Sequence, residues 1–274
     1  KGEPYFCTDH LYHKQHLVQT WCEFHKLKFD GNVMPELYFT PNEIESVRDS
    51  INTDKPILLL QTNGGMYAGN PKPYCWTRDL PHAQAQHLVN ELVKDYYIVH
   101  VTRPECKPLE GTQRLDEIDK RKLMLLPSIS HNCLLIDSCL QHAAAALQKK
   151  STVLWVGTKP NVFGYDIHDN ILPSENIIND RNTAFIDSLF FDYDFNGHDH
   201  EYPFTSNDIF KLQDVYDSVV GPADGSTPLG NPQGFQDLVK AASEDVIVDP
   251  KEVENMPEIN NPLMVEGPHE PLIL

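Results

Sequence analysis

Basic residues are scarce in this chain of 274 residues. Its 22 lysines and arginines stand against 40 aspartates and glutamates, which gives a formal net charge of −18. Binding to nucleic acid or to an anionic membrane surface requires a basic face that neutralises phosphate groups. The composition therefore argues against both as the main partner, although a local basic pocket could still hold a small anion.

Long apolar runs are also missing. No stretch approaches the ~18 consecutive apolar residues that a membrane-spanning helix needs, and no signal peptide is visible. The cysteines contain no Cys-x-x-Cys pair and two of them flank a predicted buried strand, so we expect reduced thiols rather than a disulfide framework. These features predict a cytoplasmic protein. The cysteines are Cys7, Cys22, Cys75, Cys106, Cys133 and Cys139.

The most regular part of the sequence runs from Ser130 to Gly164. An apolar run from Asn132 to Ile136 has the length of a strand, an alanine-rich helix is expected from Leu140 to Gln148, and a β-branched strand from Ser151 to Val156. Two apolar strands joined by a helix form a βαβ unit, whose strands lie parallel and buried. Ligands of such sheets bind beyond the carboxyl ends of the strands.

The segments before this unit show the same alternation. Strands are predicted from Ile57 to Gln61 and from Tyr96 to Thr102, with a helix from about Pro81 to Lys94 between them and a charged helix from Asp116 to Leu125 after them. A loop rich in glycine and proline follows the first strand. This order predicts an α/β fold with a Rossmann-like parallel sheet flanked by helices.

Less regular segments flank this core. Before it, the pattern predicts a helix from about Thr8 to Leu27, a short strand from Leu37 to Phe39 and a helix from Pro41 to Ser50. After it, a further helix is expected from Thr205 to Val220. A clear hydrophobic periodicity therefore supports only the strands and helices predicted between Ile57 and Val156.

Two groups of histidines raise the question of a metal site. His10, His13 and His16 recur every third residue of the first expected helix, and residues 198–200 read His-Asp-His in a polar loop. Neither group includes a full set of metal ligands. Solvated histidines are the simpler interpretation, so no metal site is predicted.

A polar cluster is expected where the strand from Asn132 to Ile136 ends. Asp137, Ser138 and His142 follow it in the pattern Asp-Ser-x-x-x-His-x-Ala-Ala. The serine hydroxyl, the first N–H groups of the helix and the imidazole could all face one anion, which the helix dipole favours. The alternative is that Asp137 and Ser138 only cap the helix and that His142 is an ordinary surface residue.

The order of these motifs resembles the heptosyltransferase-type (family 9) glycosyltransferases. Arg-Asp-Leu-Pro at 78–81 follows the glycine loop, and Gly-Thr-Lys-Pro at 157–160 follows the Asp-Ser-x-x-x-His pattern. The resemblance covers roughly Pro35 to Val220. It implies the GT-B architecture, in which two Rossmann-like domains face each other across a cleft, and this chain would be mainly the C-terminal half of a GT-B fold.

The resemblance also implies a site for a nucleoside-diphosphate sugar. The family has a lysine or arginine that contacts the donor diphosphate. Arg78 matches it best and Lys72 is a second candidate, whereas an ion pair of Arg78 with Asp79 or Asp95 is the alternative. The family usually shows Asp-Thr-Gly-x-x-His. Here Ser138 keeps the hydroxyl of the threonine, and Cys139 replaces the glycine. Glycine has no β-carbon and so permits the ligand to approach the backbone closely. The implied donor-binding residues are Thr62, Asn63, Gly64, Lys72, Arg78, Asp137, Ser138, Cys139, His142, Thr158 and Lys159.

The implied reaction is transfer of a sugar from this donor to a hydroxyl of a glycan or lipid-linked acceptor. The leaving diphosphate gains charge in the transition state, and N–H groups, a hydroxyl and a cation would stabilise it without a metal or another cofactor. No residue is assigned as the general base. The alternative is a non-catalytic domain of the same fold that serves as a structural or interaction module in a larger assembly.

The resemblance divides the chain into three parts. Residues 1–52 would be the end of an N-terminal, acceptor-side domain with its hinge, residues 53–220 the nucleotide-sugar-binding domain, and residues 221–274 an acidic, proline-rich tail. The tail has little apolar surface to offset the entropy of ordering it, so it should be extended. It would either contact its own domain or a protein partner, or remain solvated. The sequence begins with Lys1 rather than Met, and a native chain that extends further is compatible with this division.

Overall fold

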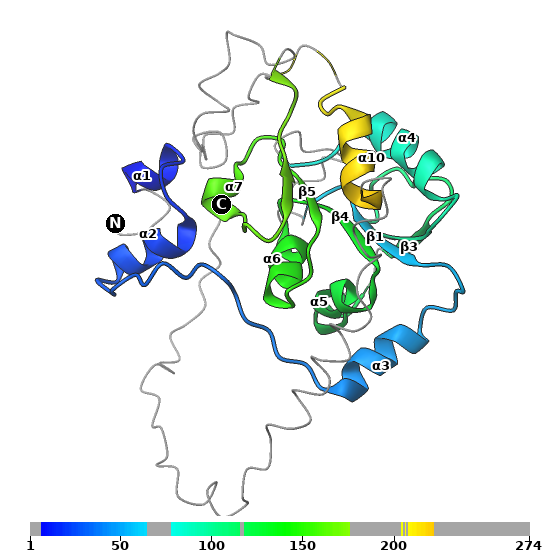
Figure 1. Cartoon of the computed structure of the whole chain (residues 1–274), viewed down its shortest axis with the longest axis horizontal. Coiled ribbons are helices and arrows are strands. Elements are labelled where there is room, and N and C mark those ends of the chain that lie inside the picture. Colours follow the sequence, from blue (N-terminus) through cyan, green and yellow to red (C-terminus); the bar gives the residue numbers. More distant parts are fainter. Residues whose placement is uncertain are drawn as a thin grey trace, which may run out of the picture. The chain divides into compact units, whose positions relative to one another are not determined.

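Within residues 7–64, 78–115, 118–175, 204, 206 and 208–221, which the structure describes, the core is a sheet of six parallel strands (Figure 1). These residues belong to one compact unit of this computed structural model. The strands are β1 (Ile57–Gln61), β2 (Tyr97–Val101), β3 (Gln113–Leu115), β4 (Asn132–Ile136), β5 (Thr152–Leu154) and β6 (Asp169–Ile171).

The strand order, β3-β2-β1-β4-β5-β6, reverses at the centre of the sheet. From β1 the chain proceeds outward to β2 and β3, and it then returns to place β4 on the other side of β1. Such a reversal is a topological switch point, and it opens a crevice at the carboxyl ends of the two central strands. The predicted Rossmann-like parallel sheet is confirmed.

Helices cover both faces of this sheet. Those that the structure describes are α1 (Thr8–Leu11), α2 (Leu17–Phe24), α3 (Pro41–Asp49), α4 (His82–Leu92), α5 (Lys120–Ile129), α6 (Cys139–Ala146), α7 (Pro160–Phe163) and α10 (Leu212–Val220). Leu58 and Ile98 pack with α4 and α10 on one face. Leu59 and Val99 pack with α3, α5 and α6 on the other. Because both faces are buried, the central strands are uninterrupted apolar runs.

Alanines bring α6 close to the sheet. Ala143, Ala144 and Ala145 are each at most 1% exposed, and side chains of this size leave little distance between the helix and β4. Only Asp137 and Ser138 separate the two elements, so the N-terminus of α6 lies directly at the carboxyl end of β4, beside the switch point.

The two central strands have the expected bounds, whereas α5 begins and ends four residues later than the predicted helix from Asp116 to Leu125, and β5 is shorter than the predicted strand from Ser151 to Val156. β1 and β4 begin and end at the predicted residues, because each is a short apolar run between polar or proline-containing segments. α3 begins with a capping box, in which the Thr40 hydroxyl accepts from the N–H of Glu43 and the Glu43 carboxylate accepts from the N–H of Thr40.

The expected single helix from Thr8 to Leu27 is wrong, because two short helices occupy this stretch. After α1 the chain turns at His13, whose φ of 55° lies in the left-handed region. α2 then begins after His16, whose Nδ1 accepts from the N–H of Val18. The side chain of His16 thus caps a second helix within the stretch that was predicted to be one helix. No glycine or proline marks this break in the sequence.

Two other expected elements also differ. Residues 37–39 form no strand; instead Arg121 of α5 donates to the carbonyl of Tyr38, which anchors the segment by a side chain. The helix expected from Thr205 begins at Leu212, because Gln84 of α4 accepts from the backbone N–H groups at 209 and 210 and holds them outside the helix.

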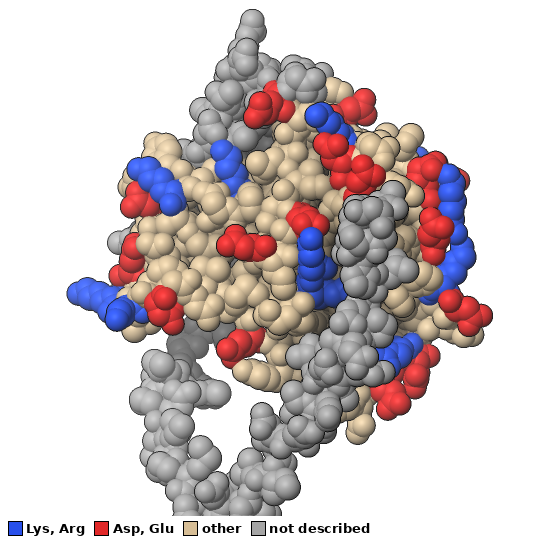
Figure 2. Space-filling model, in the orientation of Figure 1, with Lys and Arg blue, Asp and Glu red and all other residues tan. Residues whose placement is uncertain are grey.

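Charged side chains of both signs are interspersed over the face seen in Figure 2, and no broad basic patch is visible among the residues drawn in colour. No helix in the described ranges is long and apolar enough to cross a membrane. The cysteines in these ranges are free thiols: Cys7, Cys22, Cys106, Cys133 and Cys139.

Truncation of the β4 core should destabilise the fold. Leu135 is 0% exposed, so Leu135→Ala should lower the free energy of unfolding by about 2–5 kcal/mol through lost burial and a cavity. Urea unfolding measures this loss. Leu172→Ala is the matched control, because Leu172 is 52% exposed. Equal losses in the two variants would contradict the described packing.

Candidate functional site

The two central strands are linked at the switch point by a side-chain hydrogen bond. Nε2 of Gln61, the last residue of β1, donates to Oγ of Ser138 over 2.8 Å. Ser138 is the N-cap of α6 but makes no capping hydrogen bond with its side chain. The interpretation of this serine as only a helix cap is therefore wrong, since its hydroxyl lies beside the end of β1.

Asp137 is the buried anion of this edge. Its Oδ2 accepts from the hydroxyl of Thr158 over 2.6 Å and lies 4.0 Å from Nε of Arg78. The aspartate is 4% exposed, and a buried charge requires such partners. Asp137 therefore holds the loop after β5 and the segment before α4 together at one point.

His142, on the second turn of α6, belongs to the same cluster. Its Nδ1 lies 2.7 Å from the hydroxyl of Tyr165. Burial, followed by the nearby His168 and Arg78, lowers the pKa of His142 to about 4. At neutral pH the ring is therefore uncharged and has one N–H to donate. It is partly buried rather than an ordinary surface residue, and it lies near Arg78.

The predicted glycine loop is anchored to β2. The hydroxyl of Thr62 is 2.8 Å from Nε2 of His100, and Nδ2 of Asn63 donates to the hydroxyl of Thr102 over 2.8 Å. Both predicted side chains are thus engaged inside the domain. These hydrogen bonds of Thr62 and Asn63 fix the path of the backbone at the end of β1.

A buried ion pair fixes the other side of this loop. Asp79 accepts from the N–H of Gly64 over 3.0 Å and from Nη2 of Arg103 over 2.9 Å. The side chains of Asp79 and Arg103 are 3% and 11% exposed. The aspartate beside Arg78 in sequence is therefore held by a different arginine, while Arg78 lies near Asp137.

The remaining predicted donor residues vary in position. Cys139 is the first residue of α6, has an exposed thiol and lies 3.7 Å (Sγ) from the Ser138 hydroxyl. Lys159 is the N-cap of α7 and is partly exposed. Lys72 falls outside the described residues.

Several residues of the site were missed by sequence reasoning. Gln61 is the last residue of β1, and Arg103 follows the end of β2 by two residues. Their position at the carboxyl ends of strands was the sequence signal that could have identified them. Tyr165 had no signal, because it reaches His142 from the loop beyond α7. The residues missed are Gln61, Asp79, His100, Arg103, Tyr165 and His168.

The N-terminal histidines pack against the site and do not form a metal centre. The ring of His16 lies 5.8 Å from that of Tyr165, and the ring of His10 lies 5.7 Å from that of Phe163 in an edge-on contact. His10 is 0% exposed, so the expectation of a solvated histidine is wrong there. Among the described residues no group of three or more His, Cys, Asp or Glu side chains could hold a metal ion, and residues 198–200 lie outside them.

A hollow of about 420 Å³ opens on the α4 side of the same edge. The loop after β1, the start of α4 and the loop after β2 line it. His82 and Lys107 are its basic lining residues, and Thr62 and Asn63 form the boundary toward the switch point. Arg78 precedes the lining residue Asp79 in sequence and lies 4.0 Å (Nε) from Oδ2 of Asp137.

Comparison with known proteins found no matching family model and no match among curated proteins. Several solved glycosyltransferase structures are similar to the chain. Heptosyltransferase II of E. coli is 16% identical, with a TM-score of 0.44, and the match covers 56% of this chain and 49% of that one. A family 9 glycosyltransferase from Veillonella parvula is 10% identical, with a TM-score of 0.48 and coverage of 74% and 59%.

The E. coli heptosyltransferase WaaC with ADP is 14% identical, with a TM-score of 0.40 and coverage of 59% of this chain and 52% of that one. The chain thus spans about half of the length of the solved structures it matches. These structures come from the group of enzymes that the motifs resemble. The assignment of the fold itself rests on the strand order and the parallel pairing.

Buried neutral histidines should make the fold sensitive to acid. The pKa values of His100 and His142 are lowered from 6.5 to about 4, mainly by burial. Between these pH values the unfolded chain binds more protons than the folded one, so stability should fall as the pH drops from about 6.5 to 4, by up to about 1.4 kcal/mol per pH unit for each histidine.

Urea unfolding at pH 7.5, 6 and 5 measures this dependence. His100→Gln should remove about one histidine's share of the slope, whereas His87→Gln, on an exposed position of α4, should leave the slope unchanged. An unaltered slope in His100→Gln would show that this imidazole is not held neutral by the fold.

Proposed function

We propose that this domain binds a nucleoside-diphosphate sugar and transfers the sugar to a hydroxyl of a glycan or lipid-linked acceptor, as the donor-binding half of a GT-B glycosyltransferase. The observation that supports this most is a convergence at the switch point. A cation (Arg78), a hydroxyl (Ser138) and a neutral imidazole (His142) meet at the N-terminus of α6.

A diphosphate suits this convergence. The first N–H groups of a helix lack partners within the helix and carry a partial positive charge, so they favour an anion. The His142 ring can add an N–H, and Arg78 adds a full charge beside them. The charge of Asp137 opposes an anion and offsets part of the charge of Arg78, so the role of Asp137 in this proposal is to position Arg78 and Thr158.

The hollow beside α4 offers room for the nucleoside. Its volume of about 420 Å³ falls within the range of about 300–1,000 Å³ that small-molecule sites occupy. It meets the diphosphate cluster at Thr62 and Asn63, so one ligand could span both. The side chains His82 and Lys107 at its rim could bind hydroxyl or phosphate oxygens.

Catalysis in this proposal consists of stabilising the leaving group. As the bond between sugar and diphosphate breaks, negative charge grows on the diphosphate, and donors that are already fixed stabilise it without reorganising. Asp137, Tyr165 and the packed α6 supply that rigidity. We propose that the transfer requires no metal ion, because Arg78 and the helix N–H groups would supply the compensating charge. No general base is assigned.

A non-catalytic domain of the same fold is the second candidate. Cys139 favours it, because its β-carbon and thiol stand where the family has glycine, at the point of closest approach to a diphosphate. Such a module would bind nucleotides weakly or not at all. Release of nucleoside diphosphate from a bound donor in the presence of an acceptor would separate the two candidates.

Loss of the His142 ring should weaken nucleotide binding. Titration calorimetry with ADP, UDP, GDP and CDP, and then with the corresponding sugar nucleotides, identifies a ligand for the wild type. His142→Ala should lower its affinity about tenfold or more, the effect of losing one strong hydrogen bond to a charged group. His87→Ala, on the exposed side of α4, is the matched control. Absence of binding by the wild type would contradict the proposed function and support the non-catalytic module.

A bound nucleotide should shield the thiol of Cys139. Alkylation by iodoacetamide, followed by mass spectrometry, reports its accessibility at the N-terminus of α6. With ligand at ten times its dissociation constant, the rate should fall about tenfold, in proportion to the unoccupied fraction. Cys22 on α2 provides an internal reference within the same sample. A nucleotide that binds without protecting Cys139 would place the ligand elsewhere.

A further inference from the structure

We propose that Tyr165 is a positioning residue of the donor site: its hydroxyl donates to Nδ1 of His142 and so keeps the imidazole proton on Nε2, as the N–H offered to the ligand. The identity of that ligand rests on the proposed function. The position of the proton does not, since it can be measured in the free protein.

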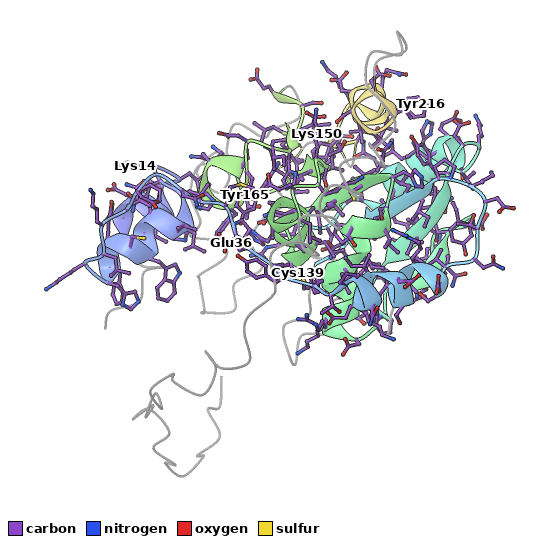
Figure 3. All side chains as sticks on the ribbon, turned by 60° about the horizontal axis from the view of Figure 1, so that its bottom comes forward. Lys14, Glu36, Cys139, Lys150, Tyr165 and Tyr216 are labelled. Atoms are coloured by element: carbon purple, nitrogen blue, oxygen red, sulfur yellow. The ribbon has the colours of Figure 1, made fainter. Side chains whose placement is uncertain are left out.

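The two side chains are in close contact. The hydroxyl oxygen of Tyr165 lies 2.7 Å from Nδ1 of His142, and the rings meet nearly at right angles, 84°, with centroids 5.5 Å apart. Tyr165 itself is 5% exposed. Figure 3 shows this tyrosine beside α7, between the N-terminal helices and α6. The phenol is thus buried in the domain, and its hydrogen bond to His142 is partly buried.

The direction of this hydrogen bond follows from the partners that each group has. Burial, and next the charge of Asp137, raise the pKa of Tyr165 to about 12, so the phenol keeps its proton, and the His142 ring is neutral. Among the described residues Nδ1 of His142 is the only hydrogen-bond partner of the phenol oxygen. If Nδ1 carried the proton, the phenol proton would be buried without an acceptor, which is costly. The phenol therefore donates, and the ring proton resides on Nε2.

Gln141 does not compete for this role. Its side-chain nitrogen is 3.2 Å from both ring nitrogens of His142 and donates to the carbonyl of Phe163 over 2.9 Å. A point equidistant from the two nitrogens at this range lies over the face of the ring, because in the ring plane it would collide with the carbon between them. The amide therefore supports the ring from above, while Tyr165 sets the tautomer.

The groups around the ring also favour its neutral form. His16 from the N-terminal segment and His168 from the loop after α7 face the same cluster, and burial lowers the pKa of each. Arg78 opposes a further positive charge, and the nearby carboxylate of Asp137 is already held by Arg78 and Thr158. His142 should therefore remain an uncharged donor from about pH 8 to pH 5.5.

Nitrogen NMR on the full chain labelled with ¹⁵N-histidine tests the assignment directly, because it distinguishes the two tautomers. The His142 signals are identified by their loss in His142→Gln. We expect the Nε2–H tautomer in the wild type, without titration between pH 8 and 5.5. A wild-type ring protonated on Nδ1 would overturn the proposal, and this measurement needs no folded variant at Tyr165.

Tyr165→Phe tests the cause. A hydroxyl that donates to Nδ1 stabilises only the neutral ring, so its removal should mix the tautomers and raise the pKa of His142. A lowered pKa would mean that the ring donates to the phenol, which would also overturn the proposal. Tyr96→Phe is the matched control, because Tyr96 is equally buried and its hydroxyl accepts from Nδ2 of Asn132 over 2.8 Å, away from His142.

The effect on the ligand is measured by calorimetry with the nucleoside diphosphate that binds the wild type. Tyr165→Phe should weaken binding about three- to tenfold, the effect of one neutral hydrogen bond, and Tyr96→Phe should not change it. Unchanged affinity in Tyr165→Phe would overturn the positioning role. If no nucleoside diphosphate binds the wild type, the proposed function fails, and the NMR result alone decides the tautomer.

Discussion

The carboxyl edge of the sheet depends on one buried charge, the carboxylate of Asp137. A buried anion must be compensated, and the two groups that compensate it come from distant parts of the chain, Arg78 before α4 and Thr158 after β5. The same carboxylate helps to keep the Tyr165 phenol protonated. Through that phenol its influence reaches the imidazole of His142. The carboxylate of Asp137 therefore helps to position Arg78 and the Thr158 loop at the start of α6, and it acts on His142 through Tyr165.

The fold delivers these groups to one place by simple means. Parallel strands bring all their carboxyl ends to the same edge, and the reversal of strand order between β1 and β4 separates the connecting loops there. Alanines bring α6 close to β4, and buried ion pairs such as Arg103 with Asp79 fix the loops. The rigidity of the edge comes from the packing below it, so the polar groups are in position before any ligand arrives.

The sequence predicted the elements that carry a strong local signal. β1 and β4 are apolar runs with polar or proline-containing flanks, and Asp137, Ser138 and His142 follow β4 in a recognisable pattern. β3, β6 and α7 were missed because three or four residues show no period. The partners of the site were missed because tertiary contacts select them: Gln61 and Ser138 are 77 residues apart. Periodicity cannot report such pairs, and it could not reveal that Tyr165 would face His142.

The packing of the N-terminal segment has a further consequence. Asn161 of α7 donates to the carbonyl of His13, and the rings of His10 and His16 lie against Phe163 and Tyr165. These contacts are a hydrogen bond and ring packing rather than ion pairs, so added salt should screen them little. Residues that precede the sheet by some forty positions in sequence thus pack against Tyr165, the hydrogen-bond partner of His142. Substitutions in this segment could therefore shift the Tyr165–His142 pair without changing any residue proposed to contact the ligand.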